Sequence, residues 1–350
     1  MWIDNIVLKE DLERIVQKDS IPWEQLKGKT ILVTGGTGLI GYNLICALAF
    51  ADIKMQLGLQ VVALVRDVAR ATDKFHKLLK DWKQLQFIKG CTEETCEINM
   101  DIDFIVHGAS PTASKFFIES PVETIKTAVT GTMNMLDLAK EKKVTGFVYL
   151  SSMEIYGSPK TEDKLTEEDL GYLNPLNVRN CYPEGKRMCE ALVASYASEY
   201  QVQAKTIRLA QTFGAGVDKS DVRVFAEFAR CANDGKDIVL LTDVASKRAY
   251  LYTMDAVSAI LTVLLKGKPG CAYNAANEAT YCSVKEMAEL VAKEISQGKS
   301  QVIIKNDKEA SKKYPPAHFY NLCTTRLQEL GWKAEYSLVA MYHRMMKSQM

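Results

Sequence analysis

The residues most capable of chemistry lie in two short segments near the middle of the 350-residue sequence. Tyr182 and Lys186 stand four residues apart in the segment YPEGK, and Ser152 lies upstream in the segment SSMEIYG. A spacing of four places the phenol and the ammonium on one face of a helix. The ammonium is expected to lower the pKa of the phenol, because it favours the phenolate, which can remove a proton from a hydroxyl group. We therefore predict that Tyr182 and Lys186 are catalytic, and that Ser152 hydrogen-bonds the same substrate oxygen as Tyr182.

A glycine-rich turn precedes these residues, between a short apolar run and an apolar helical pattern. The turn has the sequence TGGTGLIG, in which the glycines follow the pattern GxxGxxG. Glycines allow a tight turn and let backbone N–H groups approach a pyrophosphate, whose charge the following helix N-terminus favours. The pattern therefore predicts a dinucleotide site. The predicted cofactor contacts in this turn are Gly35, Thr37, Gly38, Leu39, Ile40 and Gly41.

The residues after the second apolar run, 61–65, bear on which dinucleotide binds. Arg66 could hold a 2′-phosphate or stack on the adenine, whereas Asp67 could bind a ribose 2′-hydroxyl or cap the next helix. We favour NAD, and NADP is the alternative.

Apolar runs and helical patterns alternate through about residue 210. Runs typical of buried parallel strands occur at 31–33, 61–65, 104–106, 147–150 and 204–209, and helical patterns at 67–82, 121–141 and 182–200. This alternation predicts an α/β fold, a Rossmann doubly wound parallel sheet, in which ligands bind at the carboxyl ends of the strands.

The chain divides into three predicted parts. Residues 1–28 form an N-terminal helical extension, 29–210 an NAD-binding Rossmann domain, and 211–350 mainly a smaller substrate-binding lobe. We expect a cleft between the two larger parts. In the last part the sequence predicts helices at 221–233, 254–265 and 283–296, and strands near 238–241, 271–274 and 301–304.

The composition excludes several classes of function. Lys and Arg total 44 against 43 Asp and Glu, so no basic surplus indicates a nucleic-acid partner. No apolar run reaches the roughly 18 residues of a membrane span, and the N-terminus lacks a signal-peptide pattern. The nine cysteines contain no CxxC pair, and the four histidines are not spaced as ligands. We therefore expect a cytoplasmic protein with reduced thiols, no bound metal and no membrane partner.

The three motifs together resemble the extended short-chain dehydrogenase/reductase superfamily of NAD-dependent sugar-nucleotide epimerases, dehydratases and decarboxylases. The resemblance runs from about residue 28 to 340. It implies a bound NAD, a nucleotide-sugar substrate, most often UDP-linked, and a homodimer. It also implies that Ser152, Tyr182 and Lys186 are the catalytic trio, with the last two contacting the cofactor. The further contacts that it implies are Ala109 and Ser110 for the cofactor, and Ser152, Gln211, Arg223 and Arg248 for the substrate, with Arg248 on the diphosphate.

The resemblance implies an opening step in which hydride leaves C4 of the sugar and a transient 4-keto sugar forms. Family 4,6-dehydratases have Asp-Glu at the positions of Met153 and Glu154, and Met153 cannot donate a proton. Simple 4-epimerases generally lack the Glu. Glu154 therefore indicates a catalytic role at C5 or C6, unless it caps the chain or pairs with a base. The segment at 171–190 is most similar to UDP-glucuronate decarboxylases, which would place the protein in polysaccharide biosynthesis.

Some residues depart from the decarboxylase pattern. Met153 replaces a Ser, and the segment 312–321 lacks a clear arginine where decarboxylases use one. Lys312, Lys313 or His318 could bind a carboxylate there. A nucleotide-sugar C4 or C5 epimerase therefore stays open. So do an NADPH-dependent keto-sugar reductase, which Arg66 suggests, and a non-catalytic dinucleotide-binding protein.

Overall fold

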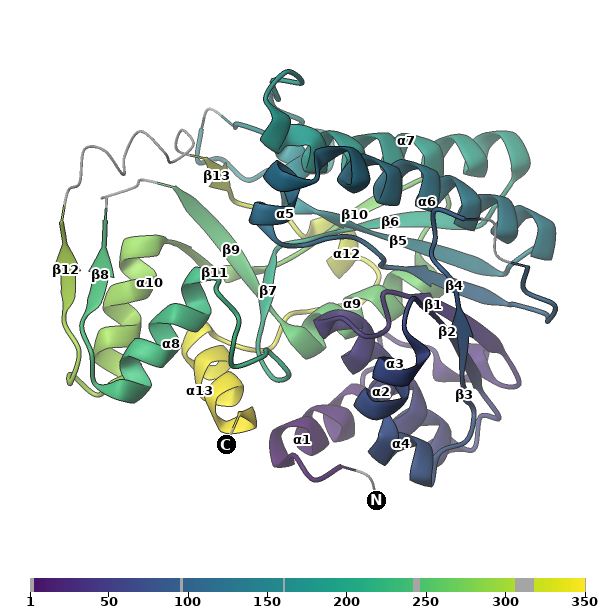
Figure 1. Cartoon of the computed structure of the whole chain (residues 1–350), viewed down its shortest axis with the longest axis horizontal. Helices are drawn as coiled ribbons and strands as arrows, with labels where there is room; N and C mark the ends of the chain where they lie inside the picture. Colours follow the sequence, from purple (N-terminus) through teal and green to yellow (C-terminus); the bar gives the residue numbers. More distant parts are fainter. Residues whose placement is uncertain (1–2, 95–96, 160, 242–245, 306–317, 350) are drawn as a thin grey trace.

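The computed structural model describes residues 3–94, 97–159, 161–241, 246–305 and 318–349. Its centre is a seven-stranded sheet in the order β10-β6-β5-β4-β1-β2-β3 (Figure 1), and all neighbours pair in parallel. The strands are β1 Thr30–Thr34, β2 Gln60–Val65, β3 Leu85–Lys89, β4 Phe104–His107, β5 Gly146–Ser152, β6 Ala204–Leu209 and β10 Ala272–Ala275. The predicted doubly wound sheet is confirmed. Its strand order reverses between β1 and β4, which is where such sheets bind ligands.

Helices cover both faces of this sheet (Figure 1). On one face α6 (Pro121–Lys142) and α7 (Cys181–Tyr200) pack against each other. On the other face α2 (Leu39–Met55) packs against α9 (Thr253–Lys266). Both α2 and α9 are buried over most of their circumference, as their nearly continuous apolar sequences require.

The helical segment that follows β2 contains one break. The predicted helix at 67–82 is two helices, α3 (Val68–Lys74) and α4 (His76–Asp81), which meet at the buried Phe75. A short helix that the sequence did not indicate, α5 (Ser114–Glu119), precedes α6. It follows β4 and therefore lies at the carboxyl end of the sheet.

The smaller lobe is built on β9 (Lys247–Tyr252). This strand pairs in parallel with β7 (Gln211–Phe213) and β13 (Phe319–Tyr320), and antiparallel with β11 (Asn277–Ser283). A separate parallel pair joins β8 (Ile238–Leu240) and β12 (Val302–Ile304). The helices of this part are α8 (Val224–Asp234), α10 (Val284–Leu290) with a π-helical turn at Val291–Ile295, α12 (Thr325–Gln328) and α13 (Leu338–Ser348).

The chain passes more than once between the two larger predicted parts. After residue 210 the chain begins the smaller lobe, returns to the large sheet through α9 and β10, and then completes the lobe. The first 28 residues form α1 (Ile6–Ile15) and a 3-10 turn at Trp23–Leu26, and α1 packs on α2, α9 and α13. The N-terminal extension is therefore part of the main body.

The structure bears on membranes and thiols only where it describes the chain. Across the described ranges, no helix is both long and apolar enough to cross a membrane. Of the cysteines in these ranges, Cys46 and Cys189 are buried. Within the same ranges no group of His, Cys, Asp and Glu is arranged to hold a metal ion.

Candidate active site

The glycine turn between β1 and α2 has the backbone that its sequence requires. Gly35 has a φ of +73°, and a Cβ there would lie 2.7 Å from the carbonyl oxygen of Gly108. A Cβ on Gly41 would lie 2.3 Å from the carbonyl oxygen of Gly35. Gly38 is less constrained, because its nearest neighbour would be 3.3 Å away, and it is the N-cap of α2 without a side-chain hydrogen bond. Gly38 thus leaves the first N–H groups of α2 uncovered, which fits a pyrophosphate.

The loop after β4 is tied to this turn by one hydroxyl. The Thr34 Oγ1 atom, at the end of β1, accepts hydrogen bonds from the N–H groups of Gly108 and Ala109, each at 3.1 Å. Its own proton faces Nδ1 of the buried His107 at 2.8 Å. Burial and the ammonium of Lys186 lower the pKa of His107 to about 3, so its imidazole is neutral. Its Nδ1 atom therefore accepts a hydrogen bond from the Thr34 hydroxyl. The predicted cofactor residues Ala109 and Ser110 therefore lie beside the glycine turn.

The two residues considered for the adenosine ribose follow β2. The Asp67 carboxylate is the N-cap of α3 and accepts a hydrogen bond from the N–H of Arg70 at 2.9 Å. The capping role considered for Asp67 is therefore present. Arg66 is exposed at the carboxyl end of β2, where its proposed contact with the ribose or adenine stays a prediction.

The helix α7 carries the Tyr–Lys pair in its first turns. Lys186 Nζ donates a hydrogen bond to the carbonyl oxygen of Leu150 at 2.7 Å. It lies 4.7 Å from the ring centre of Tyr149 and 5.7 Å from that of Tyr182. The side chain is buried, and this burial lowers the pKa of Lys186 to about 8.

Tyr182 lies between an aromatic ring and two polar groups. Its ring stacks on Phe117 of α5, with centres 4.3 Å apart and planes 9° from parallel. Burial raises the pKa of Tyr182, the Glu154 carboxylate raises it further, and a hydrogen bond from Ser152 opposes both effects. The net direction is opposite to the lowering that the Tyr–Lys spacing predicts, so that prediction is wrong for this arrangement. The reason is that burial disfavours the phenolate and the Glu154 carboxylate adds a negative charge, while the Lys186 ammonium donates to the Leu150 carbonyl and lies 5.7 Å from the centre of the Tyr182 ring.

Glu154 lies in a 3-10 turn, Met153–Tyr156, directly after β5. Ser152 is the N-cap of this turn and accepts a hydrogen bond from the N–H of Glu154 at 3.2 Å. The Glu154 carboxylate pairs with Arg179, whose Nη2 atom is 2.9 Å from one oxygen and 3.2 Å from the other. Met153 is buried in the core, so it offers the site no polar group.

Arg179 belongs to none of the motifs recognised in the sequence. It lies in the short turn Val178–Asn180, just before α7 and three residues ahead of Tyr182. That spacing of about one helical turn could have indicated a shared location with the phenol. Its pairing with Glu154 joins the loop after β5 to the start of α7.

The predicted substrate arginines lie in different surroundings. Arg248 in β9 has its Nη2 atom 2.8 Å from Nε2 of His318, and its buried Nε has no hydrogen-bond partner among the described residues. Arg223, at the start of α8, makes an ion pair with Asp221 at 2.5 Å. Gln211 in β7 pairs with β9. Lys312 and Lys313 lie outside the described residues.

Tyr320 of β13 shows which of these charges are neighbours. Burial raises the pKa of Tyr320, and the charge of Glu154 raises it further. The cations of Arg248 and Arg179 lower it. Arg248, the predicted diphosphate ligand, and the Glu154–Arg179 pair therefore lie around the Tyr320 phenol. Arg223 instead pairs with Asp221 of its own segment.

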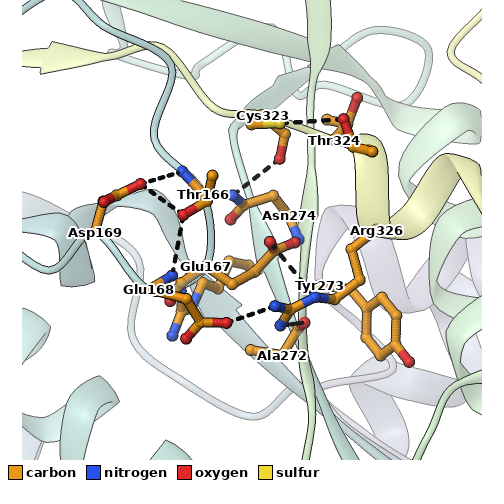
Figure 2. Close-up of polar contacts among 12 residues, drawn as sticks. Thr166, Glu167, Glu168, Asp169, Ala272, Tyr273, Asn274, Cys323, Thr324 and Arg326 are labelled. Carbon is orange, nitrogen blue, oxygen red and sulfur yellow. Dashed lines mark hydrogen bonds and ion pairs between the residues drawn. The ribbon is translucent and has the colours of Figure 1, made fainter.

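A polar cavity of about 580 Å³ lies at the edge of the large sheet, among β6, β10, α7 and α12. Figure 2 shows part of its wall, where Arg326 points toward Glu167 and Glu168 and donates a hydrogen bond to the carbonyl oxygen of Ala272. Within the described ranges, its lining includes none of the predicted catalytic, cofactor or substrate residues. Arg326 pairs with Glu167 and Glu168, and Arg208 pairs with Glu190, so we assign the cavity no ligand.

A buried charge pair in the cavity wall reaches the catalytic segment. Arg208 of β6 makes a bidentate ion pair with Glu190 of α7, at a shortest distance of 2.7 Å. Glu190 also accepts a hydrogen bond from Ser151 at 2.5 Å, and Arg208 donates one to the Tyr156 hydroxyl at 2.9 Å. Ser151 lies in β5 just before the turn that carries Glu154, and Tyr156 is the last residue of that turn. The pair therefore holds that turn at both ends.

Comparisons with known proteins identify the family of the chain. A family model described as "NAD dependent epimerase/dehydratase family" matches residues 31–276. UDP-glucuronic acid decarboxylase 6 of Arabidopsis thaliana is 30% identical over 312 residues, which cover 88% of this chain and 85% of the relative. UDP-glucuronic acid decarboxylase 5 of the same plant is 29% identical over 312 residues, with the same coverage.

Solved structures share the fold at lower identity. UDP-glucose 4-epimerase of Thermotoga maritima, solved with UDP-glucose, superimposes with a TM-score of 0.73 at 20% identity, covering 91% of this chain and 98% of the other. The dTDP-glucose 4,6-dehydratase DesIV of Streptomyces venezuelae, solved with NAD, gives a TM-score of 0.73 at 20% identity, covering 91% and 97%. The matched residues contain the glycine turn, Ser152 and the Tyr–Lys pair, and the chain belongs to the NAD-dependent epimerase/dehydratase family.

Proposed function

We propose that the protein is a UDP-glucuronate decarboxylase that acts through a transient 4-keto sugar. The observation that carries this proposal is the position of Glu154, whose carboxylate is close enough to Tyr182 to raise its pKa and is held there by Arg179. A carboxylate beside the residue that acts on C4 can serve chemistry at the next carbon, C5. The decarboxylase names of the relatives at about 30% identity support the same reaction.

The opening step needs a base at the C4 hydroxyl. Bound NAD supplies a hydride acceptor at C4 and returns the same hydride at the end of the cycle. Tyr182, as the phenolate, takes the hydroxyl proton, and Ser152 donates a hydrogen bond to the same oxygen. Lys186 contributes a buried positive charge behind the phenol, which favours the phenolate as it forms. The glycine turn and the uncovered N-terminus of α2 hold the dinucleotide phosphates.

Carbon dioxide then leaves from the 4-keto uronate, which is a β-keto acid. The bond between C5 and C6 breaks, and its electron pair forms an enolate whose charge rests on the C4 oxygen. The Tyr182 and Ser152 hydroxyls donate hydrogen bonds to that oxygen and stabilise the charge. A proton from the solvent reaches C5 through the Glu154 carboxyl group, which takes it up and passes it on. Reduction of the C4 ketone then completes the cycle without net consumption of cofactor.

The decisive experiment is to incubate the protein with UDP-glucuronate and NAD in deuterated water, and to analyse the products by mass spectrometry. Decarboxylation predicts loss of one CO₂ and gain of one deuterium at C5. An unchanged skeleton that gains deuterium would instead establish C5 epimerisation through Glu154, which is the second candidate. Unreacted substrate would overturn both, and chromatography of the same sample would reveal C4 epimerisation.

A cofactor measurement separates this proposal from a net reductase. A decarboxylase or epimerase recycles its cofactor and can retain it, whereas a reductase must release spent cofactor in every turnover. We expect NAD(H), and not NADP(H), to be released when the purified protein is denatured. Recovery of NADP(H) would favour the reductase alternative and assign Arg66 to a 2′-phosphate.

We also propose that the protein is a cytoplasmic homodimer. The two copies associate through α5, α6 and α7. The support is a set of exposed apolar side chains on α5, α6 and α7. They are Ile118, Val122, Ile125, Met133 and Met188, each at least 40% exposed. Exposed apolar side chains gathered on neighbouring helices are typical of a protein interface.

A further inference from the structure

We propose that Arg187 is a positioning residue that holds the Glu154 carboxyl group in place for proton transfer to C5 of the sugar. The inference rests on the proposed function, because it assumes a 4-keto intermediate whose C5 gains a proton. Arg187 directly follows Lys186 in α7, and the sequence motifs assign it no role. It acts on the backbone beside Glu154 and not on the substrate.

The guanidinium of Arg187 joins the helix α7 to the turn that carries Glu154. Its Nε atom donates a hydrogen bond to the carbonyl oxygen of Ile155, the residue after Glu154, at 2.8 Å. From the preceding position of the helix, Lys186 Nζ donates to the carbonyl oxygen of Leu150 at 2.7 Å. The two bonds lie on either side of Glu154 along the chain. The catalytic helix therefore holds the backbone both before and after this carboxylate.

A second donor of the same guanidinium holds the neighbouring segment. Arg187 Nη2 donates a hydrogen bond to the carbonyl oxygen of Gly171 at 2.6 Å. The N–H of Gly171 donates to the carbonyl oxygen of Tyr156 at 3.0 Å, and the chain then runs on to Arg179, which pairs with Glu154. Arg187 therefore anchors both of the segments that the Glu154–Arg179 ion pair joins.

The other bonds to this backbone come from neutral groups. The carbonyl oxygen of Glu154 accepts from the N–H of Gly157 at 3.0 Å, and that of Gly157 accepts from the Tyr320 hydroxyl at 2.9 Å. A hydrogen bond from an ionised donor is roughly twice as strong as a neutral one. The Arg187 side chain is 24% exposed, so water competes little for its donors. Its removal should therefore loosen the turn more than loss of one neutral bond.

Two steps of the proposed reaction depend differently on this turn. Hydride transfer at C4 uses Tyr182, which the helix itself places. When CO₂ leaves, the electron pair of the C5–C6 bond forms the enolate, and C5 then takes one proton through Glu154. A misplacement of about 1 Å can cost 10²-fold in rate. Arg187 therefore affects the step at C5, and the face of C5 that receives the proton, more than the step at C4.

The test compares the two steps in Arg187→Gln on the NAD-loaded enzyme at saturating UDP-glucuronate. Absorbance of NADH in the first turnover reports hydride transfer, whose rate should stay within about 3-fold of the unaltered enzyme. Formation of the UDP-pentose product should slow about 10- to 100-fold, as for a displaced proton donor. Arg187→Lys should fall between, because it keeps the charge and cannot bridge both carbonyl groups.

Deuterated water gives a readout that a purely structural role would not change. NMR resolves the two hydrogen positions at C5 of the UDP-pentose. The unaltered enzyme should place deuterium in one of them, since Glu154 delivers it from one face. Arg187→Gln should distribute deuterium over both positions, because solvent then protonates the enolate from either face.

The matched control is Arg230→Gln. Arg230 is an exposed arginine of α8 that also donates to two backbone carbonyl oxygens, those of Lys219 and Asp221, but in the smaller lobe. This variant should leave the ratio of the two rates and the position of deuterium unchanged.

A double variant shows whether Arg187 acts through Glu154. In Glu154→Gln no carboxyl group remains to be positioned, so adding Arg187→Gln should slow product formation less than about 3-fold further. Full additivity of the two effects would overturn the inference. Equal slowing of hydride transfer and product formation by Arg187→Gln would also overturn it, as would unchanged rates with a single deuterium position. If Arg187→Gln does not fold, Arg187→Lys decides by the same ratio and the same deuterium position.

The proposed function fails in a different way. If the unaltered enzyme releases no CO₂ from UDP-glucuronate, the decarboxylase proposal is wrong, and the inference fails with it. If it releases CO₂ while Arg187→Gln keeps both rates and a single deuterium position, only the role of Arg187 is wrong.

Discussion

The chemistry of Tyr182 and Lys186 depends more on the groups that contact them than on their spacing of four residues. Phe117 covers the phenol ring, Ser152 donates to its oxygen, and Lys186 is anchored behind it on a backbone carbonyl. Because burial raises the pKa of Tyr182, the phenol keeps its proton until other charges favour the phenolate. Proton transfer from the substrate is therefore coupled to what binds beside it.

Replacing Tyr182 by Phe tests the catalytic assignment. The variant should lower kcat by about 10²- to 10⁴-fold, as for a lost general base, while Kd for UDP-glucuronate stays within a few-fold. Turnover and calorimetric binding are measured on the same preparation. Tyr172→Phe is the control, since Tyr172 is 69% exposed, and should keep full activity. Full activity of the Tyr182 variant would refute the assignment.

The titration of Lys186 predicts how activity depends on pH. Burial lowers the pKa of Lys186 from its ordinary value of 10.5 to about 8, so the ammonium is lost as pH rises through 8. We expect kcat to fall over that range, because the positive charge behind Tyr182 disappears. A kcat that stays constant up to pH 9.5 would contradict this role.

Stability should change in the opposite direction over the same range. Since the folded pKa of Lys186 lies below the unfolded one, the unfolded chain binds more protons between pH 8 and 10.5. The contribution of Lys186 to the free energy of unfolding therefore rises with pH there. Urea midpoints measured beside kcat would separate loss of the ammonium from unfolding.

At the scale of elements, the site forms where three loops meet at the carboxyl end of the sheet. The glycine turn after β1 and the loop after β4 are joined through Thr34, and the turn after β5 is held by the Arg208–Glu190 pair. Arg179 then joins that turn to the start of α7. Each functional side chain is therefore placed by contacts between segments that are distant in sequence.

Two glycine substitutions separate packing from cofactor binding in the turn. Gly41→Ala brings a Cβ within 2.3 Å of a backbone oxygen, so it should destabilise the fold by about 1–3 kcal/mol and abolish NAD binding. Gly38→Ala should change stability by less than about 1 kcal/mol, since its closest contact is 3.3 Å, and weaken NAD binding about 10-fold or more. Thermal unfolding and NAD affinity are the two measurements. Unaltered NAD affinity in the Gly38 variant would argue against a phosphate at this helix N-terminus.

At the scale of the whole molecule, the N-terminal extension and the smaller lobe are joined through one buried carboxylate. Asp11 of α1 accepts hydrogen bonds from the hydroxyls of Tyr252 and Tyr336, and pairs with Arg344 of α13 at 2.7 Å. Asp11 and Arg344 come from opposite ends of the chain, and Figure 1 shows α1 and α13 near the two termini. The extension therefore fixes the position of the helix that closes the smaller lobe.

The proposed homodimer can be tested on the exposed face of α6. Ile125→Asp places a charge in the apolar surface, so it should convert a dimer of about twice the chain mass to a monomer. Light scattering coupled to gel filtration measures the mass. Ile303→Asp is the control, because Ile303 is 42% exposed on the β8–β12 pair, and should leave the dimer intact. A monomeric unaltered protein would refute the proposal.

The sequence alone determined the dinucleotide turn and five strands of the large sheet, whereas β3 was not predicted and β10 was predicted as a strand of the smaller lobe. Buried parallel strands are short apolar runs, and the turn needs glycine at Gly35 and Gly41 whatever lies further away, so both signals are local. In the smaller lobe the strands predicted near 238–241 and 301–304 are β8 and β12, whereas β7, β9, β11 and β13 were not predicted. In β11 buried and partly exposed residues do not alternate regularly, and β13 has only two residues, so neither carries a periodic pattern.

Only the tertiary structure decided how the candidate site works. The pairing of Glu154 with Arg179, the contact of Arg248 with His318 and the raised pKa of Tyr182 all depend on which loops meet and how deeply they are buried. Electrostatic interactions act across space and grow as water is excluded, so residue spacing along the chain cannot report them. The sequence thus determined which groups are present, and the packing of distant segments decided which of them act together.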